Sequence, residues 1–119
     1  MFKILLVDHQ TNTRERYRQD LESAGFAVAT AGGGTEAIRL LREWVPDLAV
    51  LDVRLGDESG LDLLRHMLEI RPSLSTILMS AFPGYRDDFV SWLADAFIDK
   101  APDATNLTSK VRELLVPVA

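Results

Sequence analysis

The sequence contains no cysteine among its 119 residues, so disulfide bonds and thiolate metal ligands are excluded. Long apolar runs are absent as well, because the apolar stretches are far shorter than the ~20 residues that a membrane-spanning helix needs. The N-terminus enters a short apolar run directly and shows no cleavage-site pattern of the kind that follows a secretion signal. We therefore expect a cytoplasmic protein that is not associated with a membrane.

Basic side chains are outnumbered, with 13 lysines and arginines against 18 aspartates and glutamates and a formal net charge of −5. Because nucleic-acid phosphates are bound by basic surfaces, we expect no direct contact with nucleic acid. The hydrophobic content of 47% and the charged content of 26% are typical of a folded globular protein. The length then favours a single domain over residues 1–119.

Five short apolar runs recur at similar intervals, at residues 4–7, 26–29, 48–51, 77–79 and 96–98. The runs at residues 4–7, 48–51 and 77–79 in particular show no alternation of apolar and polar positions, as is typical of a strand when helices cover both faces of its sheet. Between the runs, apolar residues recur at helical spacing within residues 17–24, 37–44, 61–68, 85–93 and 105–115. Strands that alternate with helices of this length predict an α/β fold with a parallel sheet and right-handed crossovers.

Four of the five predicted strands are followed by a polar residue that could carry chemistry. These residues are Asp8, Asp52, Ser80 and Lys100. The carboxyl ends of parallel strands meet at one edge of the sheet, where open α/β sheets bind their ligands. A lone polar residue at a strand end is commonly a turn former or a helix cap, but two carboxylates, a hydroxyl and an ammonium group at one edge indicate a functional site.

Two other features are interpreted as structural. Residues 32–34 are three consecutive glycines whose spacing fits neither a P-loop nor a dinucleotide fingerprint, so we expect an ordinary turn with Thr35 as the N-cap of the next helix. Arg14, Arg16 and Arg18 crowd the first predicted helix and are expected to form a solvated face.

Over nearly its whole length the chain resembles the receiver domains of bacterial two-component response regulators. Residues 3–8 are similar to the family's first strand and acidic corner, and residues 47–55 and 59–61 to its phosphoacceptor strand and loop. Residues 77–81 are similar to its Ser/Thr-Ala strand end, and residues 97–100 to its aromatic-x-x-Lys segment. The resemblance implies a flavodoxin-like (βα)5 fold, a doubly wound parallel sheet with strand order 2-1-3-4-5.

The resemblance also implies that Asp52 is a nucleophile that accepts a phosphoryl group from a sensor histidine kinase or a phosphotransfer protein. Lys100 would pair with the phosphoryl oxygens, and Ser80 would form a hydrogen bond to one of them. Phe97, at the family's aromatic switch position, would swing inward and change the surface presented to an output domain or a partner protein. Such a protein is a signalling switch, and we do not expect it to be an enzyme.

The family's chemistry further implies a Mg²⁺ ion, held by Asp8, Asp52 and the backbone carbonyl of Arg54. The sequence departs from the family at His9, which stands where a second acidic residue usually contacts the metal. Mg²⁺ prefers oxygen ligands, whereas imidazole suits Zn²⁺, Cu²⁺ or Ni²⁺ better, so His9 is a poor Mg²⁺ ligand and we expect weak Mg²⁺ binding. His9 either supplies positive charge to the site when it is protonated, or turns to solvent.

Three smaller departures from the family concern loops. Gly56 stands where the family usually has proline, which leaves the loop after Asp52 less constrained. Lys100 is followed by Ala101, so we expect a trans peptide bond where the family often has a cis Lys-Pro bond. The segment between Ser80 and Lys100 is shorter than usual, and we expect the helix within it to be short or distorted.

Three alternative functions use the same residues. A degenerate receiver would act through protein contacts without phosphorylation, and His9 favours this hypothesis because it removes an acidic metal ligand. A small phosphohydrolase would use Asp8 as its nucleophile, but its general acid/base would have to stand where Gln10 does. A flavin site is weaker still, because Asp8 would repel the flavin phosphate.

Overall fold

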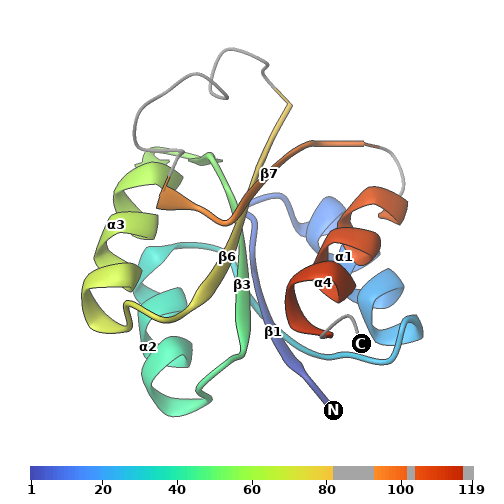
Figure 1. Cartoon of the computed structure of the whole chain (residues 1–119). Helices are drawn as coiled ribbons and strands as arrows, with labels where there is room; N and C mark the ends of the chain where they lie inside the picture. The colour runs from blue at the N-terminus through green and yellow to red at the C-terminus, as the bar shows by residue number, and fades with distance from the viewer. Residues whose placement is uncertain (82–92, 102–103, 117–119) are drawn as a thin grey trace.

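A five-stranded parallel sheet forms the centre of the structure, a computed structural model that describes residues 1–81, 93–101 and 104–116 (Figure 1). Its strands are β1 (Lys3–Val7), β2 (Ala27–Ala31), β3 (Leu48–Asp52), β6 (Ser75–Ser80) and β7 (Ala96–Asp99). The helices in the described residues are α1 (Thr11–Ser23), α2 (Gly34–Glu43), α3 (Gly60–Ile70) and α4 (Thr105–Leu115). Five expected strands and four expected helices are thus confirmed. The remaining expected helix, at residues 85–93, lies almost wholly outside the described residues, and its shortness stays a prediction.

The strands follow the order β2-β1-β3-β6-β7, and every neighbouring pair is parallel. When only the strands of this sheet are numbered, the order is the expected 2-1-3-4-5. Two short strands that were not predicted, β4 (Arg54–Leu55) and β5 (Glu58–Ser59), pair antiparallel in a separate hairpin after β3. The chain runs from β1 to one side and then crosses back to β3, so the switch point of the sheet lies between β1 and β3.

Helices cover both faces of the sheet, with α2 and α3 on one face and α1 and α4 on the other (Figure 1). Successive residues of β1 alternate between the two cores: Leu5 and Val7 pack toward α2 and α3, while Ile4 and Leu6 pack toward α1 and α4. These two buried faces explain why the strand is apolar at every position. Among the described residues, no helix combines the length and the apolar character that crossing a membrane requires.

Helix α1 ends just before a glycine. Tyr17 and Leu21 are buried on its core side, and Ala24 is the C-cap. Gly25 follows with a φ of +99°, a left-handed conformation that glycine adopts without strain at the end of a helix. The chain then turns directly into β2.

The start of helix α2 corrects the expectation for Thr35. The N-cap is Gly33, and Thr35 lies within the first turn of the helix. The carboxylate of Glu58, in β5, instead accepts a hydrogen bond from the Gly34 amide at 3.0 Å. A Cβ on Gly34 would lie 2.6 Å from this carboxylate, so the glycine leaves room for a cap that comes from 24 positions downstream.

We expect Gly60→Ala to be one of the most damaging small substitutions in the chain. Gly60 begins α3 beside the end of β3, and an added Cβ would lie 1.9 Å from the backbone carbonyl oxygen of Asp52. Because the obstacle is backbone, relief requires a shift of β3 or α3. The free energy of unfolding, measured by chemical denaturation, should fall by about 3 kcal/mol or more.

Gly25→Ala is the matched control, because nothing lies within 4 Å of the added Cβ. Only the left-handed backbone disfavours alanine there, at a cost of about 1–2 kcal/mol. Equal losses of stability in the two variants would contradict the close approach of α3 to β3.

Candidate functional site

Three charged side chains meet at the carboxyl edge of the sheet. Asp8 follows β1, Asp52 ends β3, and Lys100 follows β7. The ammonium nitrogen (Nζ) of Lys100 lies 2.8 Å from Oδ2 of Asp8 and 2.6 Å from Oδ2 of Asp52. The expected proximity of these three side chains is therefore confirmed.

The three side chains are nearly enclosed, since 3%, 11% and 12% of the side-chain surfaces of Asp8, Asp52 and Lys100 are exposed. Burial by itself lowers the pKa of Lys100, but the hydrogen bonds and negative charges of Asp52 and Asp8 outweigh burial and raise that pKa above its ordinary value. Lys100 is therefore charged throughout the neutral pH range. Its ammonium group offsets the charge of two buried carboxylates that would otherwise repel each other.

The loop after β1 and helix α1 each hold Asp8 through one hydrogen bond. The Gln10 amide donates to Oδ1 of Asp8 at 2.9 Å, and the guanidinium of Arg14 donates to the Asp8 backbone carbonyl at 2.7 Å. Arg14 is partly buried beside the site, so the expected solvated face does not describe it fully, whereas Arg16 is exposed and Arg18 is partly exposed. No sequence motif predicted this role for Arg14. Its acceptor is a backbone carbonyl, and since every residue has one, the sequence does not indicate which carbonyl an arginine will bind.

The turn after β3 orients Asp52. The Arg54 amide donates a hydrogen bond to Oδ1 of Asp52 at 3.2 Å, while Oδ2 accepts from Lys100, so the two carboxylate oxygens have different partners. The Val53 amide donates to the carbonyl of Met79 at 2.9 Å, which ties the turn to β6. The turn that follows Asp52 is thus tied both to the carboxylate and to β6.

Two hydrogen bonds position the segment that carries Lys100. The Lys100 amide donates to the Ser80 carbonyl at 2.8 Å. The hydroxyl of Tyr17, in α1, donates to the Ala101 carbonyl at 2.5 Å, and burial raises the pKa of Tyr17 so that the hydroxyl stays protonated. The peptide bond between Lys100 and Ala101 is trans, as expected. Tyr17, whose spacing predicted only a core residue, therefore also anchors the loop after β7.

Ser80 and Phe97 lie on the strands beyond β3. The register places Met79 beside Asp52, so Ser80 lies one residue further along β6, where it is 2% exposed. Phe97, in β7, is partly buried and packs against the core beneath α2 and α3. Both residues lie near the predicted site in the sheet, and their roles in phosphoryl binding and switching stay predictions.

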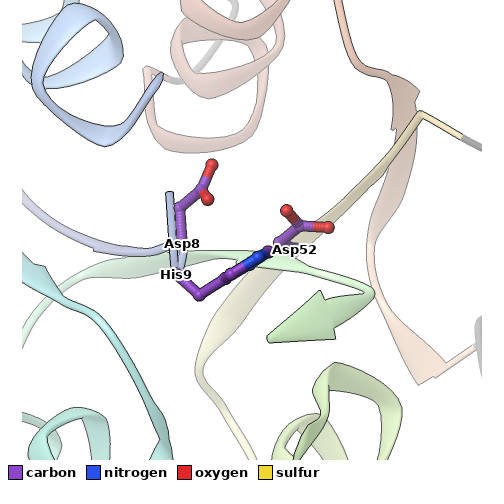
Figure 2. A group of neighbouring side chains, drawn as sticks. All are labelled: Asp8, His9 and Asp52. Atoms are coloured by element: carbon purple, nitrogen blue, oxygen red, sulfur yellow. The ribbon is translucent and has the colours of Figure 1, made fainter. Parts of the chain in front are cut away.

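His9 is exposed, yet its ring lies beside the two carboxylates (Figure 2). One ring nitrogen of His9 and one carboxylate oxygen each from Asp8 and Asp52 lie within 4.8 Å of one another. The ring therefore lies at the site, and the positive charge that it was expected to supply there stays a prediction. The two carboxylates offer the oxygen ligands that a divalent cation needs, and the third donor is a nitrogen, so the residues fit a divalent ion with a mixed ligand set.

A small pocket of about 160 Å³ opens over Asp52 and Lys100. Its other lining residues are His9, Gln10, Arg54 and Ala81. A larger cavity of about 660 Å³, between α2, α3 and β5, is lined by neither Asp8, Asp52 nor Lys100. The smaller pocket is therefore the candidate site, and its size suits an ion or a small anionic group.

We expect Lys100→Met to lower the free energy of unfolding by about 3 kcal/mol at pH 7, because it leaves two buried carboxylates without their counter-charge. In the wild type, the raised pKa of Lys100 means that its stabilisation is fully present below the ordinary lysine value of about 10.4 and is lost only at higher pH. The variant has no charge to lose at that position. The deficit relative to the wild type should therefore be constant through the neutral range and shrink as the pH rises above about 10.4, where the wild type loses the charge of Lys100 as well.

Denaturant unfolding at several pH values measures this difference. Lys110→Met is the matched control, because Lys110 forms an exposed ion pair with Glu113 and its loss should change stability by under about 0.5 kcal/mol. A deficit in Lys100→Met that does not depend on pH would contradict the electrostatic explanation.

Comparison with protein families matches residues 4–112 to the response regulator receiver domain. Among curated proteins, the probable transcriptional regulatory protein TcrX of Mycobacterium tuberculosis is 32% identical over 114 residues, which covers 94% of this chain and 49% of TcrX. The alginate biosynthesis transcriptional regulatory protein AlgB of Pseudomonas aeruginosa is 39% identical over 79 residues, which covers 66% of this chain and 18% of AlgB. The chain thus spans half or less of these two relatives.

Solved structures agree with the family match. The response regulator protein TrrA of Thermotoga maritima, in complex with Mg²⁺-BeF, has a TM-score of 0.91 and 33% sequence identity, with 97% of this chain and 100% of that chain covered. TrrA in complex with the histidine kinase ThkA has a TM-score of 0.89 and the same identity, with 97% of this chain and 99% of that chain covered. The family match includes Asp8, Asp52 and Lys100, whose side chains converge in the structure. The chain therefore belongs to the response regulator receiver domain family.

Proposed function

We propose that this receiver domain is the phosphoacceptor of a two-component signalling system and that Asp52 accepts a phosphoryl group from a histidine kinase. One observation carries the proposal: the buried Asp52 carboxylate lies 2.6 Å from the Lys100 ammonium group, in a small pocket at the carboxyl edge of the sheet. A carboxylate can receive a negatively charged group only where a cation is already in place to offset the charge. The kinase complex of the relative TrrA supports the same type of partner.

In the proposed reaction, an oxygen of Asp52 forms a bond to phosphorus while the bond from phosphorus to the donor histidine nitrogen breaks. The bonding electron pair leaves with the donor imidazole, which takes up a proton. Lys100 shifts from the shared carboxylate oxygens to the phosphoryl oxygens, and Ser80 donates a hydrogen bond to one of them. The Arg54 amide holds the turn after Asp52 through the step.

A divalent ion would supply further positive charge for the transferring group. Asp8 and Asp52 would bind Mg²⁺ through their carboxylates, and Arg54, which borders the pocket, would bind it through its backbone carbonyl. Because His9 adds neither an oxygen donor nor a negative charge, we propose that Mg²⁺ binds more weakly here than in receivers with two adjacent acidic residues.

Phosphorylation of Asp52 adds negative charge beside Lys100 and so weakens the hold of Lys100 on Asp8. We propose that Ser80 then moves toward the phosphoryl group and that Phe97 swings inward, which changes the surface around β7 and α4. The curated relatives are longer proteins, so the output is another domain or a partner protein. We propose that the switch is cytoplasmic and is not an enzyme. The net charge of −5 supports the further proposal that it binds no nucleic acid itself.

A degenerate receiver is the second candidate, because His9 replaces an acidic ligand at the metal corner. In that case the chain would act through protein contacts alone. Lys100 would offset the two carboxylates in a degenerate site as well, so the pairing alone does not separate the two candidates. The phosphoacceptor is favoured because the pocket keeps both a carboxylate nucleophile, Asp52, and a cation beside it, Lys100. The phosphohydrolase and flavin hypotheses receive no support from the family match.

Intact-mass spectrometry after treatment with acetyl phosphate and a divalent ion tests phosphorylation directly. We expect the wild type to gain the mass of one phosphoryl group, and Asp52→Asn to gain none, because an amide cannot act as the nucleophile. Asp57→Asn is the matched control, since Asp57 is an exposed acid in the nearby turn and should leave labelling intact. An unmodified wild type across several divalent ions and pH values would favour the degenerate receiver.

Weak Mg²⁺ binding has its own test in His9→Asp. The added carboxylate supplies an oxygen ligand and a negative charge, so the Mg²⁺ dissociation constant should fall by about tenfold or more. Isothermal titration calorimetry or NMR shifts measure the change. Micromolar Mg²⁺ binding by the wild type would show that His9 does not weaken the site.

A further inference from the structure

Two positions at which the sequence departs from the receiver pattern are neighbours in space. Cδ2 of the His9 ring lies 3.8 Å from the place that a Cβ of Gly56 would occupy. Gly56, between β4 and β5, has a φ of +65°, a left-handed conformation that favours glycine. The turn of this hairpin therefore packs beside the imidazole where the ring borders the pocket over Asp52.

The three donor side chains are close to the arrangement of ligands around one ion. Two ligands at ~2.1 Å from a metal lie at most ~4.2 Å from each other, and the donors of Asp8, His9 and Asp52 lie within 4.8 Å. Figure 2 shows the His9 ring directed toward Asp52, with the Asp8 carboxylate beside them. A small side-chain rotation is enough to bring all three donors onto a single ion.

The donor types distinguish between possible ions. Late first-row ions such as Co²⁺ and Zn²⁺ accept both imidazole nitrogen and carboxylate oxygen, whereas Mg²⁺ gains little from a nitrogen ligand. His9 and Asp8 are consecutive, so both come from the same end of β1, while Asp52 comes from the neighbouring strand. Because His9 lies on the exposed side, solvent or a phosphoryl oxygen can supply the remaining ligands.

Lys100 strengthens this discrimination, because any cation at this corner competes with its ammonium group for Asp8 and Asp52. An ion that binds the two carboxylates must displace Lys100 from them, which weakens its net binding. An ion that also binds His9 gains a further bond for which Lys100 does not compete. The nitrogen ligand therefore favours the ions that accept it.

We propose that His9, Asp8 and Asp52 form a mixed nitrogen and oxygen site that selects a late first-row divalent ion over Mg²⁺. The inference rests on the proposed function in one respect: this ion would be the one that assists phosphoryl transfer to Asp52. In this proposal the histidine in place of an acid changes which metal the domain uses. Phosphoryl transfer to Asp52 still depends on a bound metal ion.

Isothermal titration calorimetry of the full chain with Co²⁺, Zn²⁺ and Mg²⁺ tests the selectivity. Late first-row ions bind most sites more tightly than Mg²⁺, so the decisive quantity is the dependence on His9. His9→Ala should weaken Co²⁺ and Zn²⁺ binding by about tenfold to a hundredfold and leave Mg²⁺ binding nearly unchanged. His9→Asp should tighten Mg²⁺ binding and so bring the Mg²⁺ dissociation constant closer to those of Co²⁺ and Zn²⁺.

A second measurement identifies the ligand itself. The chain has two histidines, and the other one, His66, is exposed on α3 outside the site. Paramagnetic Co²⁺ should shift or broaden the NMR resonances of the His9 ring at substoichiometric concentration, and those of His66 only in large excess. His66→Ala is the matched control and should leave Co²⁺ and Zn²⁺ affinity unchanged.

The inference is overturned if His9→Ala binds Co²⁺ and Zn²⁺ as tightly as the wild type, or if His66 responds first. This outcome differs from a failure of the proposed function. If Asp52 is phosphorylated with Mg²⁺ and His9→Ala leaves both this labelling and metal affinity unchanged, the metal inference is wrong and the proposed function still holds. If Co²⁺ or Zn²⁺ binds tightly at His9 but no phosphodonor labels Asp52 with any ion, the metal inference holds and the proposed phosphoacceptor function is wrong.

Discussion

One ammonium group between two buried carboxylates is the interaction on which the rest of this site depends. Moving Asp8 and Asp52 out of water costs several kcal/mol per ion, and Lys100, at 2.8 and 2.6 Å from them, offsets that cost in the resting fold. The same ammonium group is the nearest cation to any anionic group that reaches Asp52. The stability of the fold and the proposed phosphoryl transfer therefore both depend on the charge of Lys100. A change in the charge of Asp52 alters the ion pairs that Lys100 forms with both aspartates.

The protein holds this trio chiefly through backbone carbonyls. Arg14 donates to the carbonyl of Asp8, and Tyr17 donates to the carbonyl of Ala101, directly after Lys100. Gly60 lets the start of α3 approach the carbonyl of Asp52 more closely than any side chain would allow. Each contact fixes the chain next to a charged residue and leaves the charged atoms free to face one another.

The proposed metal ligands share Asp8 and Asp52 with this trio and add His9. His9 is the residue that distinguishes this domain from receivers with two adjacent acids, and Gly56 lies directly beside its ring. Lys100 offsets part of the charge of Asp8 and Asp52 without a metal, whereas the proposed choice of metal depends on the donor atom that His9 supplies. A domain can therefore keep its phosphoacceptor electrostatics while its ion selectivity changes.

The sequence by itself determined the five strands, four of the helices, and the meeting of Asp8, Asp52 and Lys100. Strands buried on both faces are apolar at every position, and parallel strands bring their carboxyl ends to one edge. The strands and the meeting of these residues can therefore be predicted from short stretches of sequence. Only the tertiary structure decided that Arg14, Tyr17 and Glu58 support the site and its surroundings, and that His9 faces Asp52. These side chains contact backbone groups or residues that are distant in sequence. Every residue has the same backbone donor and acceptor groups, so the sequence does not indicate which of them a side chain will bind.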